Sequence, residues 1–565
     1  MFLLFLLGCI LVLVQGQTNL IHNGDFETTS YNGNWYCIAC TLTSDNDAYQ
    51  GQHSVHVSNR HQNWAGAAQN LQIQGNEVYK ASGRVKLWNT HDGSDYQEVT
   101  FMLACKDGSG KNTYSKFGST SRVKPGQWYE IGGALRSGSG SHSCHIYVQT
   151  PAPTDYALDS VTVVHIPHDS NWKSHANQRI NANRKADITI SLAGAGVDSS
   201  SVDIELKQDK MEFIMGSEVP ARLITGSNHA FQDVFYKNFE WGVLENALKW
   251  GSMEHSQGHI NYNTPLLAMD TMISHGIKLR CHCAFWDVDK NVQQWVKNLD
   301  RTHLLSAIND RIDGVVGRTH GKCEQWDVNN EMFHGSFFEK HTGNPDITMD
   351  MFRRIHSKDS HPDLYLNDYS VISGADSATE MKDFAMKYKQ AGVPIGGIGV
   401  QGHLHMFDVE VIKARLDILA EAGLPIMVTE FAINERDENK KASHLVDVMT
   451  MLFSHPSVKG ILFWGFWDQD IWEHDAPLYT GSNVTPNAAG RAYENLFHNT
   501  WRTHVTHTIS GHQQYHVRGF KGDYTLTVKH NGHTLKTEHF TLTDGGKNVE
   551  VHLDGNNGVS HVIVG

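Results

Sequence analysis

The sequence has no long run of lysine or arginine, and its 47 basic side chains are outnumbered by 61 acidic ones, which gives a formal net charge of −14. Nucleic acids and anionic membrane surfaces both favour proteins with clustered positive charge. The composition therefore argues against nucleic acid and membrane as partners. Neutral polymers remain possible ligands.

Long apolar runs are also absent, except at the N-terminus. Residues 1–16 read MFLLFLLGCILVLVQG, which is shorter than the roughly 20 apolar residues that a membrane span requires. The run ends in small residues, as a secretory signal does, although it lacks the usual basic start. A membrane anchor is the alternative. We expect residues 1–16 to be a signal peptide and the protein to be secreted to the extracellular space.

Cysteine is scarce, and one of the eight lies in the predicted signal peptide. The other seven are Cys37, Cys40, Cys105, Cys144, Cys281, Cys283 and Cys323. In an oxidising compartment most should pair, pairing within residues 37–144 is plausible, and an odd number leaves at least one thiol free. The run Cys281-His282-Cys283 suggests zinc as an alternative, but no second ligand cluster follows at zinc spacing. We therefore expect no metal.

A chain of 565 residues suggests three or four domains, at about 150 residues each. Residues 17–167 alternate short polar and apolar runs with turns rich in Gly, Asn and Ser, which predicts a β-sandwich. The segments 19–27, 58–66 and 156–161 resemble carbohydrate-binding modules of the kind appended to cellulases and xylanases. A sandwich that only packs or spaces is the alternative.

If this predicted module binds sugar, we expect Trp64 and Tyr114 to be stacking platforms, because flat aromatic faces suit sugar rings. We expect Arg60 to contact a sugar hydroxyl. Residues 168–211 are interpreted as a linker with a few extra strands. Residues 500–565 are again β-like, with turns at 531–532 and 544–546, and predict a small C-terminal β domain without a catalytic role.

Between residues 212 and 499 strand-like runs alternate with amphipathic helical stretches, which predicts parallel strands joined by helical crossovers. The expected strands are 212–217, 240–244, 278–285, 323–330, 364–368, 396–401, 426–430 and 460–466. The expected helices include 265–275, 303–319, 378–391, 409–422, 442–453 and 487–497. Eight such units predict a (β/α)8 TIM barrel in an α/β fold, with its chemistry at the carboxyl ends of the strands. A doubly wound open sheet is the alternative, but no Gly-rich phosphate loop follows the first strand.

Two of the expected strands end in a glutamate. Trp326-Asp327-Val328-Asn329-Asn330-Glu331 is one, and Pro425-Ile426-Met427-Val428-Thr429-Glu430-Phe431 is the other. A pair of carboxyl groups on separate strand ends is what glycoside hydrolysis needs, one as proton donor and one as nucleophile or base. The alternative is two capping or salt-bridged glutamates.

The expected strand ends also carry further polar and aromatic groups suited to binding a sugar. In chain order they are Glu245, Asn246, Lys249 and Trp250; His282 and Trp286; Asn330; Asn367, Asp368 and Tyr369; Gln401 and His403; and Trp464 and Trp472. With the strand end that carries Glu430, these make seven clusters in register, which are hard to explain as core.

This set of motifs resembles glycoside hydrolase family ten, the endo-β-1,4-xylanase family, over residues 212–499. The resemblance implies that Glu331 is the general acid/base and Glu430 the nucleophile. It implies that Asn330 and Gln401 contact the sugar at the cleavage point and that His403 orients the nucleophile. The other expected substrate-binding residues are Glu245, Asn246, Lys249, His282, Trp286, Trp464 and Trp472. The sequence departs from the family pattern where the usual Trp-His is Trp286-Asp287, which leaves contacts beyond the cleavage point open.

We therefore expect a retaining endo-β-1,4-glycanase that hydrolyses xylan, as a monomer and without a cofactor. An endoglucanase, or an enzyme that cuts both xylan and cellulose, is the alternative within catalysis. A non-catalytic sugar-binding protein on a disused barrel is the alternative outside it.

Overall fold

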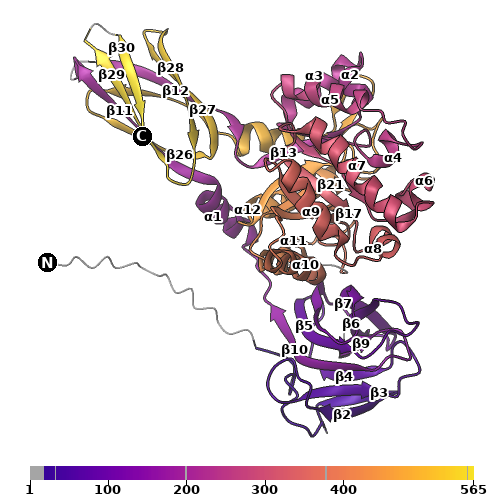
Figure 1. Cartoon of the computed structure of the whole chain (residues 1–565). Coiled ribbons are helices and arrows are strands. Elements are labelled where there is room, and N and C mark those ends of the chain that lie inside the picture. The colour runs from indigo at the N-terminus through magenta and orange to yellow at the C-terminus, as the bar shows by residue number, and fades with distance from the viewer. Residues whose placement is uncertain (1–17, 32, 141, 198–199, 376–377, 556–557) are drawn as a thin grey trace, which may run out of the picture. The chain divides into compact units, whose positions relative to one another are not determined.

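The computed structural model describes residues 18–565, apart from residues 32, 141, 198–199, 376–377 and 556–557 (Figure 1). The predicted signal peptide lies outside the described residues. The chain forms two units. The first runs to His168 and includes Ala375–Glu380, and the second comprises Asp169–Gly374 and Met381–Gly565. Within the described residues, no helix has the length and apolar character to cross a membrane.

The first unit is a β-sandwich, as predicted. One five-stranded sheet has the order β1-β4-β9-β6-β7 and the other β2-β3-β10-β5-β8. The alternating burial along β5 shows why the sequence folds this way, since every second side chain points into the core between the sheets. The strands are β1 (Trp35–Ile38), β2 (Thr41–Asp45), β3 (Ser54–Ser58), β4 (Gly66–Leu71), β5 (Val78–Leu87), β6 (Gln97–Lys106), β7 (Asn112–Val123), β8 (Trp128–Arg136), β9 (His142–Gln149) and β10 (Tyr156–Ile166).

Six of the seven expected cysteines form disulfides, which are Cys37–Cys40, Cys105–Cys144 and Cys281–Cys323. The predicted pairing within residues 37–144 is confirmed. Cys283 is the remaining thiol and is buried. The bond from Cys281 to Cys323 removes one sulfur ligand that the alternative zinc site would need.

The second unit contains a closed parallel barrel, and the predicted (β/α)8 fold is confirmed. The strand order is β15-β14-β13-β22-β21-β19-β18-β17, and pairing of β15 with β17 closes the sheet. Because the sheet is closed, the alternative of a doubly wound open sheet is excluded. The strands are β13 (Ile214–Val219), β14 (Trp241–Leu244), β15 (Lys278–Cys281), β17 (Gln325–Asn330), β18 (Asp363–Asp368), β19 (Gly397–Val400), β21 (Ile426–Ile433) and β22 (Val458–Phe463), with β16 (Phe285–Trp286) and β20 (His403–Leu404) as short additions.

Helices connect the barrel strands and cover the sheet (Figure 1). They are α2 (Ala221–Thr225), α3 (His229–Asn238), α4 (Trp250–Met253), α5 (Asn263–Ser274), α6 (Gln294–Lys297), α7 (Arg301–Thr319), α8 (Phe337–Thr342), α9 (Ile347–Lys358), α10 (Ala378–Gln390), α11 (Val409–Ala420), α12 (Glu438–Ser454) and α13 (Ala488–Asn495). Helix α7 shows how the local sequence determines where a helix begins and which face it buries. Asp300 caps it by accepting a hydrogen bond from the His303 amide at 2.9 Å, and Leu304, Ile308 and Ile312 recur at every fourth position on its buried face.

Residues 185–211 differ from the interpretation as a linker with extra strands. They form β11 (Lys185–Ala195) and β12 (Ser201–Met211), which are inner strands of the C-terminal sandwich. Its sheets have the orders β26-β11-β29-β30 and β25-β12-β27-β28. The remaining strands are β25 (His504–Ser510), β26 (Gln514–Phe520), β27 (Gly522–His530), β28 (His533–Leu542), β29 (Lys547–Asp554) and β30 (Val559–Val564). The physical reason is the alternating apolar side chains of β11 and β12, which fill the core between the two sheets.

Helix α1 (Trp172–Arg184) precedes β11 and is held to the barrel by its last residue. The buried guanidinium of Arg184 donates to the carbonyl oxygens of Phe453, His455 and Val458 at 2.8, 2.6 and 2.6 Å. These carbonyls lie in the last turn of α12 and just after it, so one side chain satisfies the end of that helix and fastens α1 beside it.

Candidate active site

A cleft of about 670 Å³ lies at the carboxyl ends of the barrel strands. All twelve barrel residues that the sequence predicts for catalysis or substrate binding line this one cleft. They are Glu245, Asn246, Lys249, His282, Trp286, Asn330, Glu331, Gln401, His403, Glu430, Trp464 and Trp472. Tyr369, which the sequence analysis named among the strand-end groups, lines it too, and the structure adds Val288, Lys290, Asn291, Ser370, Ser373, Gly374, His405 and Glu473. Convergence of parallel strand ends explains why residues so far apart in sequence meet here.

Glu331 follows β17 with a left-handed backbone, at φ 58°. Its amide donates to the carbonyl oxygen of Asn367 on the neighbouring strand at 2.9 Å, which fixes this uncommon conformation. Its carboxyl oxygens accept hydrogen bonds from Trp286 Nε1 at 2.7 Å and from Gln401 Nε2 at 2.9 Å. Burial raises the pKa of Glu331, and the negative charge of Glu430 adds to that effect, while the two hydrogen bonds oppose it. The net result is a carboxyl group that holds its proton above the usual pH.

Glu430 stands on β21, whose eight residues are all buried. Oε1 accepts a hydrogen bond from Asn367 Nδ2 at 3.1 Å, and Oε2 lies 3.2 Å from His403 Nε2. Burial alone would raise the pKa of Glu430. The hydrogen bond from His403, together with positive charge on His282, His403 and Lys249, outweighs burial and lowers this pKa below its ordinary value. Two carboxyl groups in one cleft are therefore driven toward opposite protonation states.

One amide joins the strands that carry the two glutamates. Asn367 Nδ2 donates to Asn330 Oδ1 at 2.9 Å as well as to Glu430, and Asn367 Oδ1 accepts from the Thr429 hydroxyl at 2.6 Å. Asn367 is fully buried and belongs to the cluster at the end of the fifth expected strand, 364–368. This bridge couples the position of Glu430 to that of the residue just before Glu331.

His282 is held by a buried charge network beneath the cleft. Its Nδ1 lies 2.9 Å from Asp327 Oδ2, and Asp327 is also paired with the guanidinium of Arg280. Arg280 donates to Gln325 Oε1 at 2.7 Å and lies over the ring of Tyr365. Sequence analysis did not select Asp327 or Arg280 as site residues, because charged residues inside a strand have no distinguishing pattern. The hydrogen bond that His282 Nδ1 donates to Asp327 fixes the ring orientation of His282.

Lys249 and the cleft tryptophans form one wall. The Lys249 ammonium lies 4.6 Å from the ring centre of Trp286 and 5.7 Å from that of Trp464, and it donates to Asn246 Oδ1 at 3.0 Å. Trp472 is 64% exposed and meets His403 edge to face, with ring centres 5.0 Å apart. Two tryptophans expected to bind substrate thus differ, since Trp464 is buried and Trp472 is open to solvent.

Asp287, where the sequence departs from the family pattern, does not face the cleft. It is fully buried, its Oδ1 accepts from the Phe338 amide at 3.0 Å, and its carbonyl oxygen accepts from the Phe337 amide at 3.1 Å. Asp287 therefore satisfies the first amides of α8, a role that an acidic side chain suits at a helix N-terminus.

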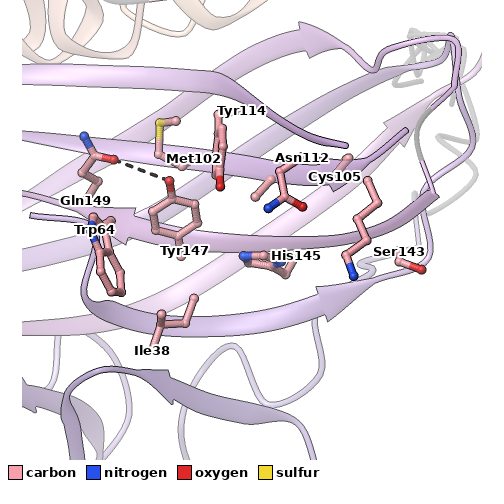
Figure 2. A pocket seen from close by; sticks show the side chains of 12 residues that line it. Ile38, Trp64, Met102, Cys105, Asn112, Tyr114, Ser143, His145, Tyr147 and Gln149 are labelled. Atoms are coloured by element: carbon pink, nitrogen blue, oxygen red, sulfur yellow. Dashed lines mark hydrogen bonds between the residues drawn. The ribbon is translucent and has the colours of Figure 1, made fainter. Parts of the chain in front are cut away.

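A second cavity, of about 540 Å³, lies on the β1-β4-β9-β6-β7 sheet of the first unit. Figure 2 shows Trp64 and Tyr114, the two predicted stacking platforms, among the side chains that line it. Both are well exposed, at 45% and 62%. His145, Tyr147 and Gln149 from β9 also line the groove. Tyr147 donates a long hydrogen bond of 3.5 Å to Gln149 Oε1, the dashed line of Figure 2. Sequence analysis did not single out the β9 residues.

The predicted sugar contact of Arg60 is contradicted. Arg60 is 1% exposed and does not line the groove. Its guanidinium donates to the carbonyl oxygens of Asn63, Ala65, Thr150 and Thr154 at 2.5–3.1 Å. Every side of the guanidinium is engaged in joining two loops of the sandwich, so Arg60 is a structural residue.

Comparison with known proteins agrees with this geometry. Residues 205–496 match the family described as Glycosyl hydrolase family 10, and residues 18–155 match the one described as Carbohydrate binding domain. The chain is 29% identical to Endo-1,4-beta-xylanase 1 of Arabidopsis thaliana, over 95% of this chain and 58% of that protein. It is 31% identical to Endo-1,4-beta-xylanase 3 of Arabidopsis thaliana, over 89% of this chain and 67% of that protein.

The chain thus spans 58% of the length of the first of these relatives. Among solved structures, xylanase 10B from Thermotoga petrophila RKU-1 in complex with xylobiose covers 51% of this chain and 95% of its own, at 23% identity and a TM-score of 0.47.

Proposed function

The chain belongs to glycosyl hydrolase family 10, and we propose on this basis that it is an endo-1,4-β-xylanase that cleaves internal linkages of xylan with retention of anomeric configuration. The observation that carries the proposal is the pair Glu331 and Glu430. They line one cleft, are connected through Asn367 and Gln401, and have pKa values that move in opposite directions.

Glu331 is the proton donor in this proposal. A glycosidic oxygen is a poor leaving group, so an acid must protonate it as the bond breaks. The raised pKa of Glu331 keeps the proton available at working pH. The bonds from Trp286 and Gln401 hold the carboxyl group in one orientation, so that the proton is delivered from a defined position.

Glu430 is the nucleophile. Its lowered pKa keeps it ionised, and its oxygens are aligned by Asn367 and His403. Attack on the anomeric carbon gives a covalent glycosyl-enzyme. Glu430 then carries no charge, which removes one cause of the raised pKa of Glu331. Glu331 can next act as base toward water, and the second displacement restores the original configuration.

The groove of the first unit supports a role in holding the polymer. Trp64 and Tyr114 offer exposed ring faces, and the polar ends of Tyr147 and Gln149 lie in the same groove (Figure 2). Sugar rings present apolar faces and equatorial hydroxyls, which such a combination contacts together. We propose that this domain binds polysaccharide and raises the local concentration of substrate for the barrel.

Secretion is part of the same proposal. Three disulfides are the supporting observation, since such bonds persist in oxidising compartments. N-terminal sequencing of protein recovered from the medium of a eukaryotic secretion host tests it. A mature N-terminus near residue 17 is expected, and a retained leader on membrane-bound protein would contradict it.

The deciding experiment is product analysis with purified protein on xylan and on carboxymethylcellulose. We expect a ladder of xylo-oligosaccharides from the start of digestion, because internal cleavage releases many lengths. NMR of the first product formed should show the β-anomer. Release only from carboxymethylcellulose would establish a glucanase instead, and binding to both polymers without any product would establish a sugar-binding protein.

A further inference from the structure

A long loop after β22 brings an additional carboxyl group, Glu473, to the cleft wall. The loop is fastened to the barrel on both sides of this residue. Asp470 is paired with Arg222 of α2, and Asp475 Oδ2 lies 3.1 Å from Arg436 Nε, which follows β21. The arginine side chains of these pairs are 68% and 87% exposed, so water screens both contacts and neither one alone decides where Glu473 lies.

His403 lies between Glu473 and Glu430. Its Nε2 is 3.2 Å from Glu430 Oε2, and its Nδ1 is 3.6 Å from Glu473 Oε1. The three side chains are 12%, 7% and 18% exposed, so water screens their charges only partly. Trp472 packs edge-on against the imidazole and restricts its rotation.

The pairing of β20 with β21 places the histidine here. His403 is opposite Ala432, and the amide of Glu430 donates to the carbonyl oxygen of Gln401 at 2.7 Å. Within the part of the chain that the structure describes, Nδ1 of His403 has no hydrogen-bond partner. The Glu473 carboxylate at 3.6 Å is therefore positioned to accept a bond from Nδ1 after a small side-chain adjustment.

Resting on the proposed hydrolase function, we propose that Glu473 is a positioning residue that acts on Glu430 through His403. A carboxylate beside Nδ1 stabilises the imidazolium form, in which both ring nitrogens carry a proton. His403 can then keep donating from Nε2 to the nucleophile. When Glu430 loses its charge on forming the glycosyl-enzyme, Glu473 still balances the charge on His403.

Other charged groups also face Glu430, and they remain when Glu473 is changed. Lys249 and His282 supply positive charge, while Glu331 and the buried Glu218 supply acidic groups. Loss of Glu473 should therefore weaken the ionisation and alignment of Glu430 rather than abolish them.

The test is kcat/KM against pH for the full chain and for Glu473→Gln, with an aryl β-xylobioside that has a good leaving group. With this substrate the rate reports attack by Glu430, because a good leaving group departs with little help from an acid. The acidic limb of the kcat/KM profile reports ionisation of groups in the free enzyme. We expect that limb to move to higher pH by about half a unit to one unit and kcat to fall about tenfold. KM should change by less than about threefold, because the variant alters the reactivity of the nucleophile and not the binding of substrate in the ground state.

Three variants make the test specific. Glu473→Asp should restore part of the lost kcat, because it keeps a carboxylate. Asp475→Asn is the matched control on the same loop and should leave the acidic limb in place, because Asp475 faces Arg436. In the background of His403→Asn, Glu473→Gln should cause little further loss, since the two residues act as a unit.

An unmoved acidic limb in Glu473→Gln, or an equal shift in Asp475→Asn, would overturn the inference. Full additivity with His403→Asn would also overturn it, and this comparison stays valid even if one single variant is less stable. Failure of the proposed function looks different, since the unaltered chain would then release no product from xylo-oligosaccharides.

Discussion

At the scale of single residues, the site depends on how two carboxyl groups of one chemical type are surrounded. Glu331 lies in a partly buried position with neutral hydrogen-bond donors, whereas Glu430 lies among His282, His403 and Lys249. Neutral donors stabilise a buried carboxylate less than positively charged groups do. The same side chain is therefore suited to give a proton at one position and to attack at the other.

Replacing Glu430 by Gln removes the nucleophile while keeping its size. We expect reducing-sugar release from xylan to fall at least about a thousandfold, because no covalent intermediate can form. Circular dichroism should show an unchanged fold, since the amide can still bond Asn367. Activity near that of the unaltered protein would rule out this assignment.

Glu331→Ala separates the acid from the nucleophile. Cleavage of xylan should fall about a hundredfold or more, because natural leaving groups need a proton. Formation of the glycosyl-enzyme from an aryl xylobioside with a good leaving group should stay fast, visible as a burst of released phenol. If both substrates lose activity equally, Glu331 is not the proton donor.

At the scale of elements, the two sheets of the first unit present different surfaces. The β1-β4-β9-β6-β7 sheet carries the groove with Trp64, whereas Trp88 follows β5 on the other sheet and stacks on His56 with ring centres 4.4 Å apart. The two tryptophans are similarly exposed, at 45% and 42%. Position on the sandwich, rather than exposure, distinguishes them.

Trp64→Ala should weaken binding to insoluble xylan, and Trp88→Ala is its matched control. Loss of one stacking face costs about 1–2 kcal/mol, roughly a tenfold weaker Kd. The measurement is a depletion isotherm on insoluble xylan, with hydrolysis of a short soluble oligosaccharide as a readout of the barrel. That hydrolysis should not change in either variant. An equal loss of binding in both variants would contradict a site in the groove.

At the scale of the whole molecule, the C-terminal sandwich is built from two stretches that the barrel separates in sequence. β11 and β12 come before the barrel, and β25 to β30 come after it. Their shared core includes Ile188, Ile190, Ile204 and Leu206 from the first stretch. The sandwich is therefore complete only when both stretches are present.

Deleting residues 501–565 alone should make the protein aggregate. Each buried aliphatic side chain that β11 and β12 lose to solvent costs about 1.5–3 kcal/mol, and both strands become open edges. Deleting residues 18–211 together with 501–565 should give more soluble protein, because no half-sandwich remains. Size-exclusion chromatography of the two truncated forms measures this. A monomeric, soluble single deletion would contradict the prediction.

Much of the site was predictable because strand ends in a barrel converge. Once the alternation of strands and helices indicates a (β/α)8 fold, residues such as Glu331, Gln401 and Glu430 are expected at one mouth, although the sequence separates them widely. The alternation in residues 17–167 likewise determined a sandwich, since period-two patterns specify which face of a strand is buried.

What only the tertiary structure decided depends on contacts between distant segments. An arginine in a polar stretch suggests a surface contact, yet Arg60 is buried because carbonyl oxygens from two loops converge on it. The partners of β11 lie more than 300 residues away, and Glu473 reaches His403 only through the path of a long loop. A residue's own sequence neighbourhood sets its local conformation and its buried face. Which remote group it meets is set by the packing of the whole chain.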